Sequence, residues 1–374
     1  MSTASTQVVI RGGTCHVLYA YDIGMAIDLK ACQGRLASLG RVTLSGRNRR
    51  APKFFDYDPP PLTIIHETTP RRLGAHEVSS YVDLTFYDFG ALSISYEIPF
   101  AGGLETLRAL SAAIAGNDDL LHDARQRAAE LQRVLGRAVD QPQLAALVED
   151  YAIFEVTDFA LPCAAAELPQ HAGPVLAQAL RGEAGELSEQ ETADALACRI
   201  SYGRDDLTLI DWNAAILFDR DAEDVRAVLE FANVELLELR CLDRQLDGSL
   251  DRSYELTLRQ SRLWRFVPGR VARHLRRISR MQLDGAILFE RVSNAPKLLG
   301  DQFLARVYRL AAQRFHLNEW STGVLRKLDT IEDFYRQLSD SASGVRLEML
   351  EWIIILLIVI EIVMPLIPGL LPRS

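Results

Sequence analysis

The stretch DLTFYDFGALSI at residues 83–94 is echoed by DLTLIDWNAAIL at residues 206–217. Both segments have an apolar run, an aspartate, an aromatic residue, a glycine or asparagine, and an alanine at corresponding positions. Glycine and asparagine tolerate the positive φ that tight turns require, so both segments are predicted to form β-hairpins. Strand-like and helix-like runs precede each of them. The pattern predicts an α+β domain over residues 1–220 built from two related halves, unless the likeness of two short alternating segments is a coincidence.

Beyond residue 220 the apolar residues recur with the spacing of long helices. Asp243 is the one polar member of the first apolar stripe, and Lys327 lies out of register in the second. The first stripe contains Val225, Leu229, Ala232, Leu236, Leu239, Leu246 and Leu250, and the second contains Leu317, Trp320, Val324, Ile331, Phe334 and Leu338. The two stripes predict a long antiparallel helical hairpin over residues 221–345, of the coiled-coil type.

The segment that connects the two stripes is strongly basic. Residues 256–283 contain no acidic residue and eight arginines, namely Arg259, Arg262, Arg265, Arg270, Arg273, Arg276, Arg277 and Arg280. The whole chain has a net charge of −9, so this segment is expected to attract phosphate-rich partners, either RNA or anionic lipid headgroups. The alternative is that these arginines pair with acidic residues elsewhere in the chain, such as Asp219 and Glu223.

The end of the chain carries a long apolar run. From Trp352 to Leu371 it contains a single charge, Glu361, and a helix of this length matches the hydrocarbon thickness of a bilayer. The run predicts a C-terminal transmembrane helix over residues 349–371, the alternative being a buried helix of a soluble core. A carboxyl within a bilayer is expected to be protonated or to find a partner, so Glu361, with Glu351 and Trp352 at the entry, predicts a homo-oligomer formed through this tail. The alternative is that Glu361 lies near the far headgroups because Pro365 ends the helix early.

The rest of the chain suggests a cytoplasmic protein. It has no second long apolar run, and its first residues lack a basic segment leading into an apolar core. Its five cysteines are scattered, without a C-x-x-C pair, which is typical of a reducing compartment. We therefore expect a single-pass tail anchor in a bacterial inner (cytoplasmic) membrane, with the bulk of the chain in the cytoplasm.

Catalytic motifs are absent from the sequence. There is no H-x-x-x-H or H-E-x-x-H arrangement, no G-x-S-x-G and no phosphate-binding G-x-x-x-x-G-K-[ST]. The enzyme-like alternative is that Asp88 and Asp211, at equivalent turn positions of the two hairpins, face each other as paired carboxylates or metal ligands. The simpler alternative is that each aspartate bonds its own backbone in the turn. The sequence therefore predicts no catalytic residue, metal or cofactor.

The C-terminal region resembles the family named for "required for meiotic nuclear division", also called domain of unknown function 155, with its Sad-interacting relatives. The resemblance rests on Leu350, Glu351 and Trp352, followed by an isoleucine-rich stretch and Glu361, and on the preceding segments DQFLARVYRLAAQRF (residues 301–315) and RKLDTIEDFYRQL (residues 326–338). It indicates a divergent bacterial member. The resemblance implies an inner-membrane protein without catalytic residues, related to mitochondrial proteins that support translation in the organelle.

These observations predict a membrane-anchored, non-catalytic interaction or tethering protein that links RNA or ribosomes to the inner membrane. Its expected partners are the lipid bilayer, further copies of itself, and RNA, the ribosome or anionic lipid headgroups. The alternative is a nucleotide- or RNA-processing enzyme with a cleft between the two α+β halves.

Overall fold

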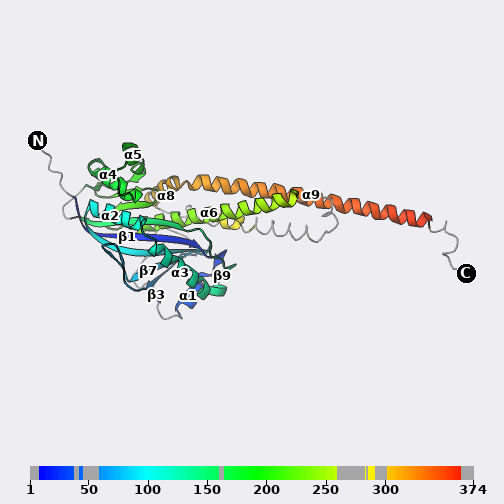
Figure 1. Cartoon of the computed structure of the whole chain (residues 1–374), viewed down its shortest axis with the longest axis horizontal. Coiled ribbons are helices and arrows are strands. Elements are labelled where there is room, and N and C mark those ends of the chain that lie inside the picture. The colour runs from blue at the N-terminus through cyan, green and yellow to red at the C-terminus, as the bar shows by residue number, and fades with distance from the viewer. Residues whose placement is uncertain are drawn as a thin grey trace. The chain divides into compact units, whose positions relative to one another are not determined.

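The fold is taken from a computed structural model, which describes residues 8–37, 42–44, 59–159, 164–258, 283, 285–290 and 301–363. The strands are β1 (Val9–Asp22), β2 (Ala26–Ile27), β3 (Val42–Leu44), β4 (Leu62–Glu67), β5 (Arg71–Leu73), β6 (His76–Val78), β7 (Tyr81–Phe86), β8 (Ala91–Gly103), β9 (Val139–Asp140), β10 (Glu149–Phe159), β11 (Arg199–Ile200), β12 (Leu207–Ile210) and β13 (Ala214–Phe218). The helices are α1 (Leu29–Ala37), α2 (Leu104–Ala115), α3 (Asp119–Leu135), α4 (Leu168–Arg181), α5 (Glu189–Ala195), α6 (Glu223–Leu258), α8 (Gln302–Arg314) and α9 (Leu317–Val363), with short 3-10 turns η1 (Gly136–Ala138) and η2 (Ala165–Glu167) (Figure 1).

The chain divides into two compact units, which are described separately. The first comprises Met1–Leu242 and Leu288–Thr322, and the second comprises Asp243–Ile287 and Gly323–Ser374.

A mixed sheet organises the first unit. Among the described residues it has nine strands in the order β11-β12-β13-β10-β1-β8-β7-β4-β3. The long strand β1 lies at its centre and pairs antiparallel with both β10 and β8. Because successive side chains of a strand point to opposite faces, β1 contributes to two cores. A central strand is buried on both sides when both faces of its sheet are covered, and the residues of β1 from Cys15 to Asp22 are accordingly all buried.

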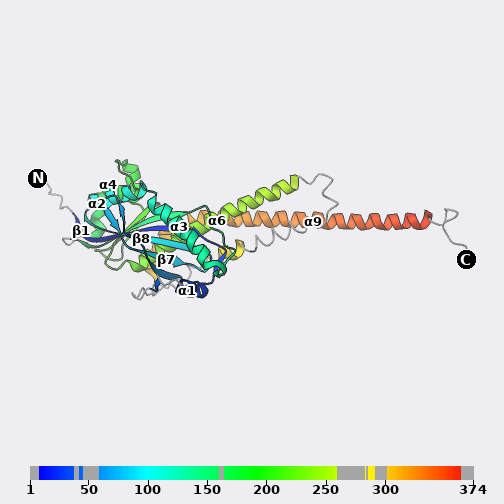
Figure 2. The same ribbon diagram turned by 60° about the horizontal axis from the view of Figure 1, so that its bottom comes forward.

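The two faces of the sheet are covered by different helices. Tyr19 and Tyr21 of β1 belong to the larger core, together with Leu107 of α2 and Ala124 of α3. Figure 2 shows α2 and α3 lying over the sheet. Ala20, on the other face, belongs to a second core with Phe231, Val234 and Leu237 of α6, and with Tyr87 and Phe89 of the β7–β8 turn. The first half of α6, as far as Leu242, thus covers the sheet as a helix of this unit.

Both predicted hairpins are confirmed. Strands β7 and β8 pair antiparallel, as do β12 and β13. The β7–β8 turn requires glycine, since Gly90 has a φ of +109° and a Cβ at this position would lie 1.8 Å from the carbonyl oxygen of Gly24. The likeness does not extend to the topology of two equivalent halves, because β8 pairs antiparallel with β1 whereas β13 pairs parallel with β10.

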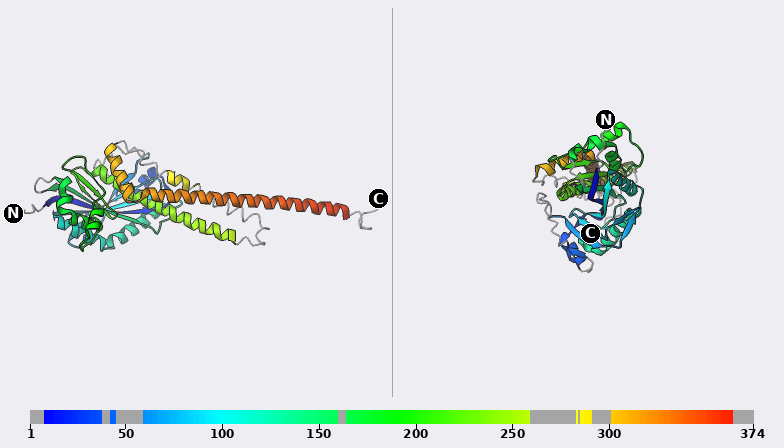
Figure 3. Two further views of the ribbon diagram at one scale, coloured as in Figure 1. Left: turned by 90° about the horizontal axis from the view of Figure 1, so that it is seen from above. Right: turned by 90° about the vertical axis from the view of Figure 1, so that its left-hand side faces the viewer.

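The predicted antiparallel direction of the helical hairpin is wrong. In the second unit Nζ of Lys327 lies 2.7 Å from Oδ1 of Asp243 and 2.6 Å from Oδ1 of Asp247, and Gly323 lies against Asp243. Residue numbers therefore increase in the same direction along α6 and α9, so the two helices run parallel. Heptad spacing is the same in either direction, so the apolar stripes alone could not fix it. Figure 3 shows α9 as one unbroken helix.

The predicted C-terminal transmembrane helix over residues 349–371 is also wrong, and with it the tail anchor and the inner-membrane location. No helix among the described residues is long and apolar enough to cross a membrane. The apolar part of α9 is described from Trp352 to Val363, which at about 1.5 Å per residue is roughly 18 Å, well below the ~30 Å of a hydrocarbon core.

Candidate functional site

A hollow of about 830 Å³ in the first unit lies beside the end of β1. Backbone hydrogen bonds connect the segments that form its wall. The segment after β1 is held on one side by the β7–β8 turn, where Ile27 N donates to Asp88 O at 2.8 Å, and on the other by Met25 N donating to Asp140 O at 2.9 Å. Gln141 next to it has a φ of +45°, a left-handed conformation that non-glycine residues rarely adopt. The hollow therefore has a rigid backbone frame.

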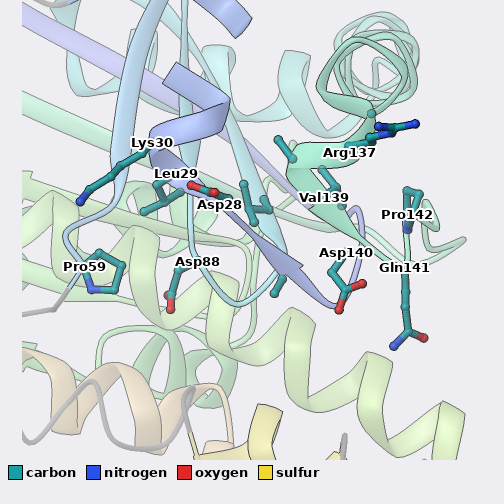
Figure 4. Close-up of a pocket in the computed structure, with 14 residues that line it drawn as sticks. Asp28, Leu29, Lys30, Pro59, Asp88, Arg137, Val139, Asp140, Gln141 and Pro142 are labelled. Atoms are coloured by element: carbon teal, nitrogen blue, oxygen red, sulfur yellow. The ribbon is translucent and has the colours of Figure 1, made fainter. Parts of the chain in front are cut away.

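Charged side chains of both signs line this hollow. Figure 4 shows Lys30, Pro59 and Asp88 at one side and Arg137, Asp140 and Gln141 at the other. Asp28 lies between them, and its Oδ1 accepts a hydrogen bond from Ala31 N at 3.0 Å, so it caps α1. The described lining holds no serine, threonine, cysteine, tyrosine or histidine. The polar groups that this lining offers are the charged side chains of Asp28, Lys30, Asp88, Arg137 and Asp140 and the amide of Gln141.

Buried carboxyls gather where α6 covers the sheet. Burial raises the pKa of Asp22 on β1 to about 6, although the N–H of Gly24 donates to its Oδ1 at 3.1 Å. Glu238 of α6 is also buried, and burial together with the charge of Asp22 raises its pKa well above its usual range. Within the described part of the chain, Oε1 of Glu238 has no hydrogen-bond partner. Two buried carboxyls whose negative charges repel in this way favour protonation of at least one of them.

Two further acidic residues tie α6 to its neighbours. The hydroxyl of Tyr308 on α8 donates to Oε2 of Glu235 at 2.6 Å, and burial raises the pKa of Glu235 to about 7. Glu149 at the start of β10 is paired with Arg240 of α6, and burial raises the pKa of this carboxyl to about 7 despite the guanidinium. These contacts make the packing of α6 sensitive to protonation.

A neutral histidine lies under the start of α6. Nη1 of Arg226 donates to Nε2 of His16 at 2.8 Å and to Oε2 of Glu155 at 2.9 Å. An arginine can only donate, so Nε2 is the acceptor and the ring proton is assigned to Nδ1. Burial is the main cause of the lowered pKa of His16. The histidine is buried in the middle of β1, so we assign it a structural role.

Asp211 does not meet Asp88. Its carboxylate is fully buried and accepts hydrogen bonds from Nε of Arg181 and Nε of Arg314, both at 2.6 Å. Strands β10 and β1 lie between the two hairpins, so at about 4.8 Å per strand the two turns are roughly 14 Å apart. The enzyme-like alternative, in which Asp88 and Asp211 face each other, is therefore wrong. The simpler alternative of a turn aspartate that bonds its own backbone does not describe Asp211 either, because two arginines from distant helices bind its carboxylate oxygens. Among the described residues no cluster of three or more metal-binding side chains occurs.

The outer face of α8 carries no carboxylate along the helix itself, although Glu319 lies 3.4 Å from His316 just beyond its end, and Asp206 accepts a hydrogen bond from the N–H of Tyr202 beside its start. The helix starts at Asp301, whose Oδ1 accepts from the N–H groups of Phe303 and Leu304. Leu304, Val307, Ala311 and Ala312 are buried, which turns the opposite face outward. The exposed side chains on that face, extended by one residue past the end of α8, are Gln302, Arg306, Arg309, Gln313 and His316. All five can donate hydrogen bonds, and the helix itself contains no acidic residue.

Aromatic rings flank this surface at both ends of α8. At its start Tyr202, 81% exposed, contacts Phe303 edge to face, and the guanidinium of Arg306 lies 5.7 Å from the Phe303 ring. At its end Trp212, 42% exposed, lies 4.9 Å from the ring of His316. We call this set, from Tyr202 and Gln302 to Trp212 and His316, the α8 surface.

The structure leaves most predicted site residues apart from this surface. The eight arginines Arg259, Arg262, Arg265, Arg270, Arg273, Arg276, Arg277 and Arg280 lie outside the described residues. Glu351, Trp352 and Glu361 lie on the exposed end of α9, in the second unit. The α8 surface was missed, although three arginines without an acid in a helix of thirteen residues are visible in the sequence. The exposure of Tyr202 and Trp212 depends on how α8 packs beside β12, which no local pattern reveals.

Comparison with known proteins identifies the family that this chain resembles. Residues 12–224 match the family model described as "Uncharacterized protein MJ0711, N-terminal domain". The chain is 26% identical over 196 residues to "Uncharacterized protein MJ0711" of Methanocaldococcus jannaschii. The aligned region covers 51% of this chain and 59% of that relative. The chain thus spans less than two thirds of the length of the relative. No solved structure matches the chain.

These matches overturn the resemblance to the family named for "required for meiotic nuclear division". That resemblance rested on a C-terminal glutamate-tryptophan pair and an isoleucine-rich helix, a composition that apolar helices share for physical reasons. The family match instead covers the mixed sheet and its helices up to the start of α6.

Proposed function

We propose that this chain, which belongs to the family described as "Uncharacterized protein MJ0711, N-terminal domain", is a non-catalytic protein that binds single-stranded RNA through the α8 surface. This function retains the interaction or tethering role predicted from the sequence, but without the membrane anchor. The observation that carries it is the exposed face of α8, which bears Arg306 and Arg309 and has no acidic residue within the helix, with an exposed aromatic ring at each end.

The charges of the surface favour a phosphate backbone. Arg306 and Arg309 are exposed one turn apart, and guanidinium groups donate in the fork geometry that suits phosphate oxygens. Arg314 is not available, because Asp211 and Asp194 hold it. The exposed arginines are therefore the groups to which we assign phosphate contacts.

The rings favour unpaired bases. Tyr202 and Trp212 lie at opposite ends of a helix of thirteen residues, about 20 Å long. Base-aromatic stacking contributes about 1–3 kcal/mol per base and requires bases that are free of a duplex. Rings and arginines on one surface suit a single strand that lies along α8.

The test measures binding of a fluorescent single-stranded RNA of about 16 nucleotides, the upper end of site sizes for such surfaces. Arg306→Gln/Arg309→Gln is expected to weaken binding and to lower the slope of log K against log salt by about 1.4, since each phosphate contact contributes roughly 0.7 for single strands. Arg125→Gln/Arg133→Gln is the matched control, because both of these arginines are exposed on α3 and their loss changes the net charge equally. Equal effects of the two pairs, or equal binding of double-stranded RNA, would contradict the proposal.

A further inference from the structure

The end of α9 exposes an unbroken run of apolar side chains. The nine residues from Trp352 to Ile360 are all apolar, and their exposed fractions range from 47% to 71%. They surround the helix on every side, because nine consecutive residues complete more than two turns. A helix that is apolar all round is normally buried.

The described part of α6, the helix beside α9, stops short of this run. In the second unit Asp243 lies level with Gly323, and Asp247 reaches Lys327, so parallel pairing sets residues about 80 apart side by side. On that register the last residue of α6, Leu258, is level with residue 338 of α9. The apolar run starts fourteen residues later, about 21 Å further along the helix. Helix α6 therefore does not cover it.

The run continues a contact stripe that is already in use. Val324, Leu328 and Ile331 are buried in the part of α9 that pairs with α6. Four heptads later the same positions of the stripe are Trp352, Leu356 and Val359, which are 71%, 61% and 50% exposed. The face that packs on a parallel helix in the first half of α9 is repeated, without α6, in the second.

The exposed area is large enough for a stable interface. Burying an apolar side chain removes about 60–120 Å² from water, the area that corresponds to 1.5–3 kcal/mol at ~25 cal/mol per Å². Nine such side chains offer roughly 500–1,000 Å², and a stable interface needs about 800 Å² from each partner.

We propose that the occupant is a second copy of this chain, and that copies associate through residues 352–360 of α9. A one-sided groove would leave half of the helix in water, whereas a bundle of like helices covers every side. The run carries no charge between Glu351 and Glu361, so no charged side chain of the run itself has to be buried where identical segments meet. Isoleucine occupies five of the nine positions, and isoleucine at the core positions of a coiled coil favours more than two strands.

Sedimentation equilibrium of the full chain tests the proposal. The wild type is expected to form an oligomer whose population grows with concentration, and Trp352→Glu/Leu356→Glu is expected to raise the dissociation constant at least about 30-fold, as loss of central interface side chains does. Both residues are exposed in the single chain, so the variant should retain its circular dichroism spectrum and melting curve.

The matched control is Glu332→Gln/Arg336→Gln, which removes a solvent-accessible ion pair from the same helix. It should associate as the wild type does. A wild type that stays monomeric, whether or not another protein or a lipid covers the run, would overturn the proposal. So would an oligomer that survives the two glutamates, or one that the control disrupts equally. RNA binding by the α8 surface is measured separately and does not depend on the outcome.

Discussion

Arg314 donates from Nε to Oδ1 of Asp211 at 2.6 Å, although the two residues are 103 positions apart in the chain. Arg181 donates to the other oxygen, and both arginines also bind Asp194. The carboxylate thereby joins α4, α5 and α8 to the β12–β13 turn, which places α8 with its arginine-bearing face outward. The α8 surface depends on this buried ion cluster.

Asp211→Asn is expected to destabilise the first unit by about 3–5 kcal/mol, because it leaves two guanidiniums without their shared buried charge. Denaturant unfolding measures the change. Asp194→Asn is the control, since the Asp194 side chain is 52% exposed and its loss should cost less than about 1 kcal/mol. Equal losses for the two variants would contradict a dominant role for the buried carboxylate.

Gly90→Ala should destabilise the β7–β8 turn by roughly 2–6 kcal/mol, the sum of backbone strain and overpacking. Its φ is +109°, and the new Cβ would meet the Gly24 carbonyl. Gly74 also has a positive φ, +57°, but no atom lies within 4 Å of its Cβ position, so Gly74→Ala separates strain from collision. Thermal unfolding in which Gly74→Ala is the more damaging change would refute this account.

Glu235→Gln should flatten the dependence of stability on pH. The pKa of Glu235 is raised from 4.5 to about 7, so its contribution to stability is complete below about pH 4.5 and is lost as the pH rises through 7. Between about pH 5 and pH 8 the wild type should lose roughly 2–3 kcal/mol that the variant retains. Unfolding measured at the two pH values checks this, with Glu332→Gln as the solvent-accessible control. An unchanged pH dependence in Glu235→Gln would exclude Glu235 as the cause.

Asp243 and Lys327 should show coupling in a double-mutant cycle. Their ion pair requires the observed register of α6 and α9, in which Asp243 and Lys327 lie side by side, and both side chains are largely buried. Asp243→Asn and Lys327→Met are each expected to destabilise the second unit, with a coupling energy of about 0.5–2 kcal/mol. Strictly additive effects would argue against the parallel pair.

Tyr202→Ala tests the aromatic part of the RNA proposal. The ring is 81% exposed and contacts only the edge of Phe303, so its loss should leave the melting temperature nearly unchanged. RNA affinity is expected to fall about 5- to 150-fold, the equivalent of ~1–3 kcal/mol for one stacked base. Tyr81→Ala serves as control, because Tyr81 is 53% exposed at the start of β7. Unchanged RNA affinity in Tyr202→Ala would remove the ring from the binding surface.

The sequence by itself determined the elements whose signals are local. The two hairpins were predictable because positive φ at Gly90 and the turn residues around Asn213 are properties of a few neighbouring residues. The two long helices were predictable because apolar residues recur along them at a fixed spacing. At the end of α9 the composition alone gave a wrong prediction. The apolar residues there indicated a membrane-spanning helix, but no helix among the described residues is long and apolar enough to be one.

Only the tertiary structure decided what these elements meet. Heptad spacing has no direction, so the parallel pairing of α6 with α9 follows from the contacts of Lys327 and not from the stripes. The topology of the sheet places two strands, β10 and β1, between the hairpins whose turns contain Asp88 and Asp211. Arg314, which binds Asp211, lies 103 positions further along the chain. Such contacts depend on the free energy of the whole packed unit, in which burial and ion pairing over long chain separations outweigh the preferences of any short segment.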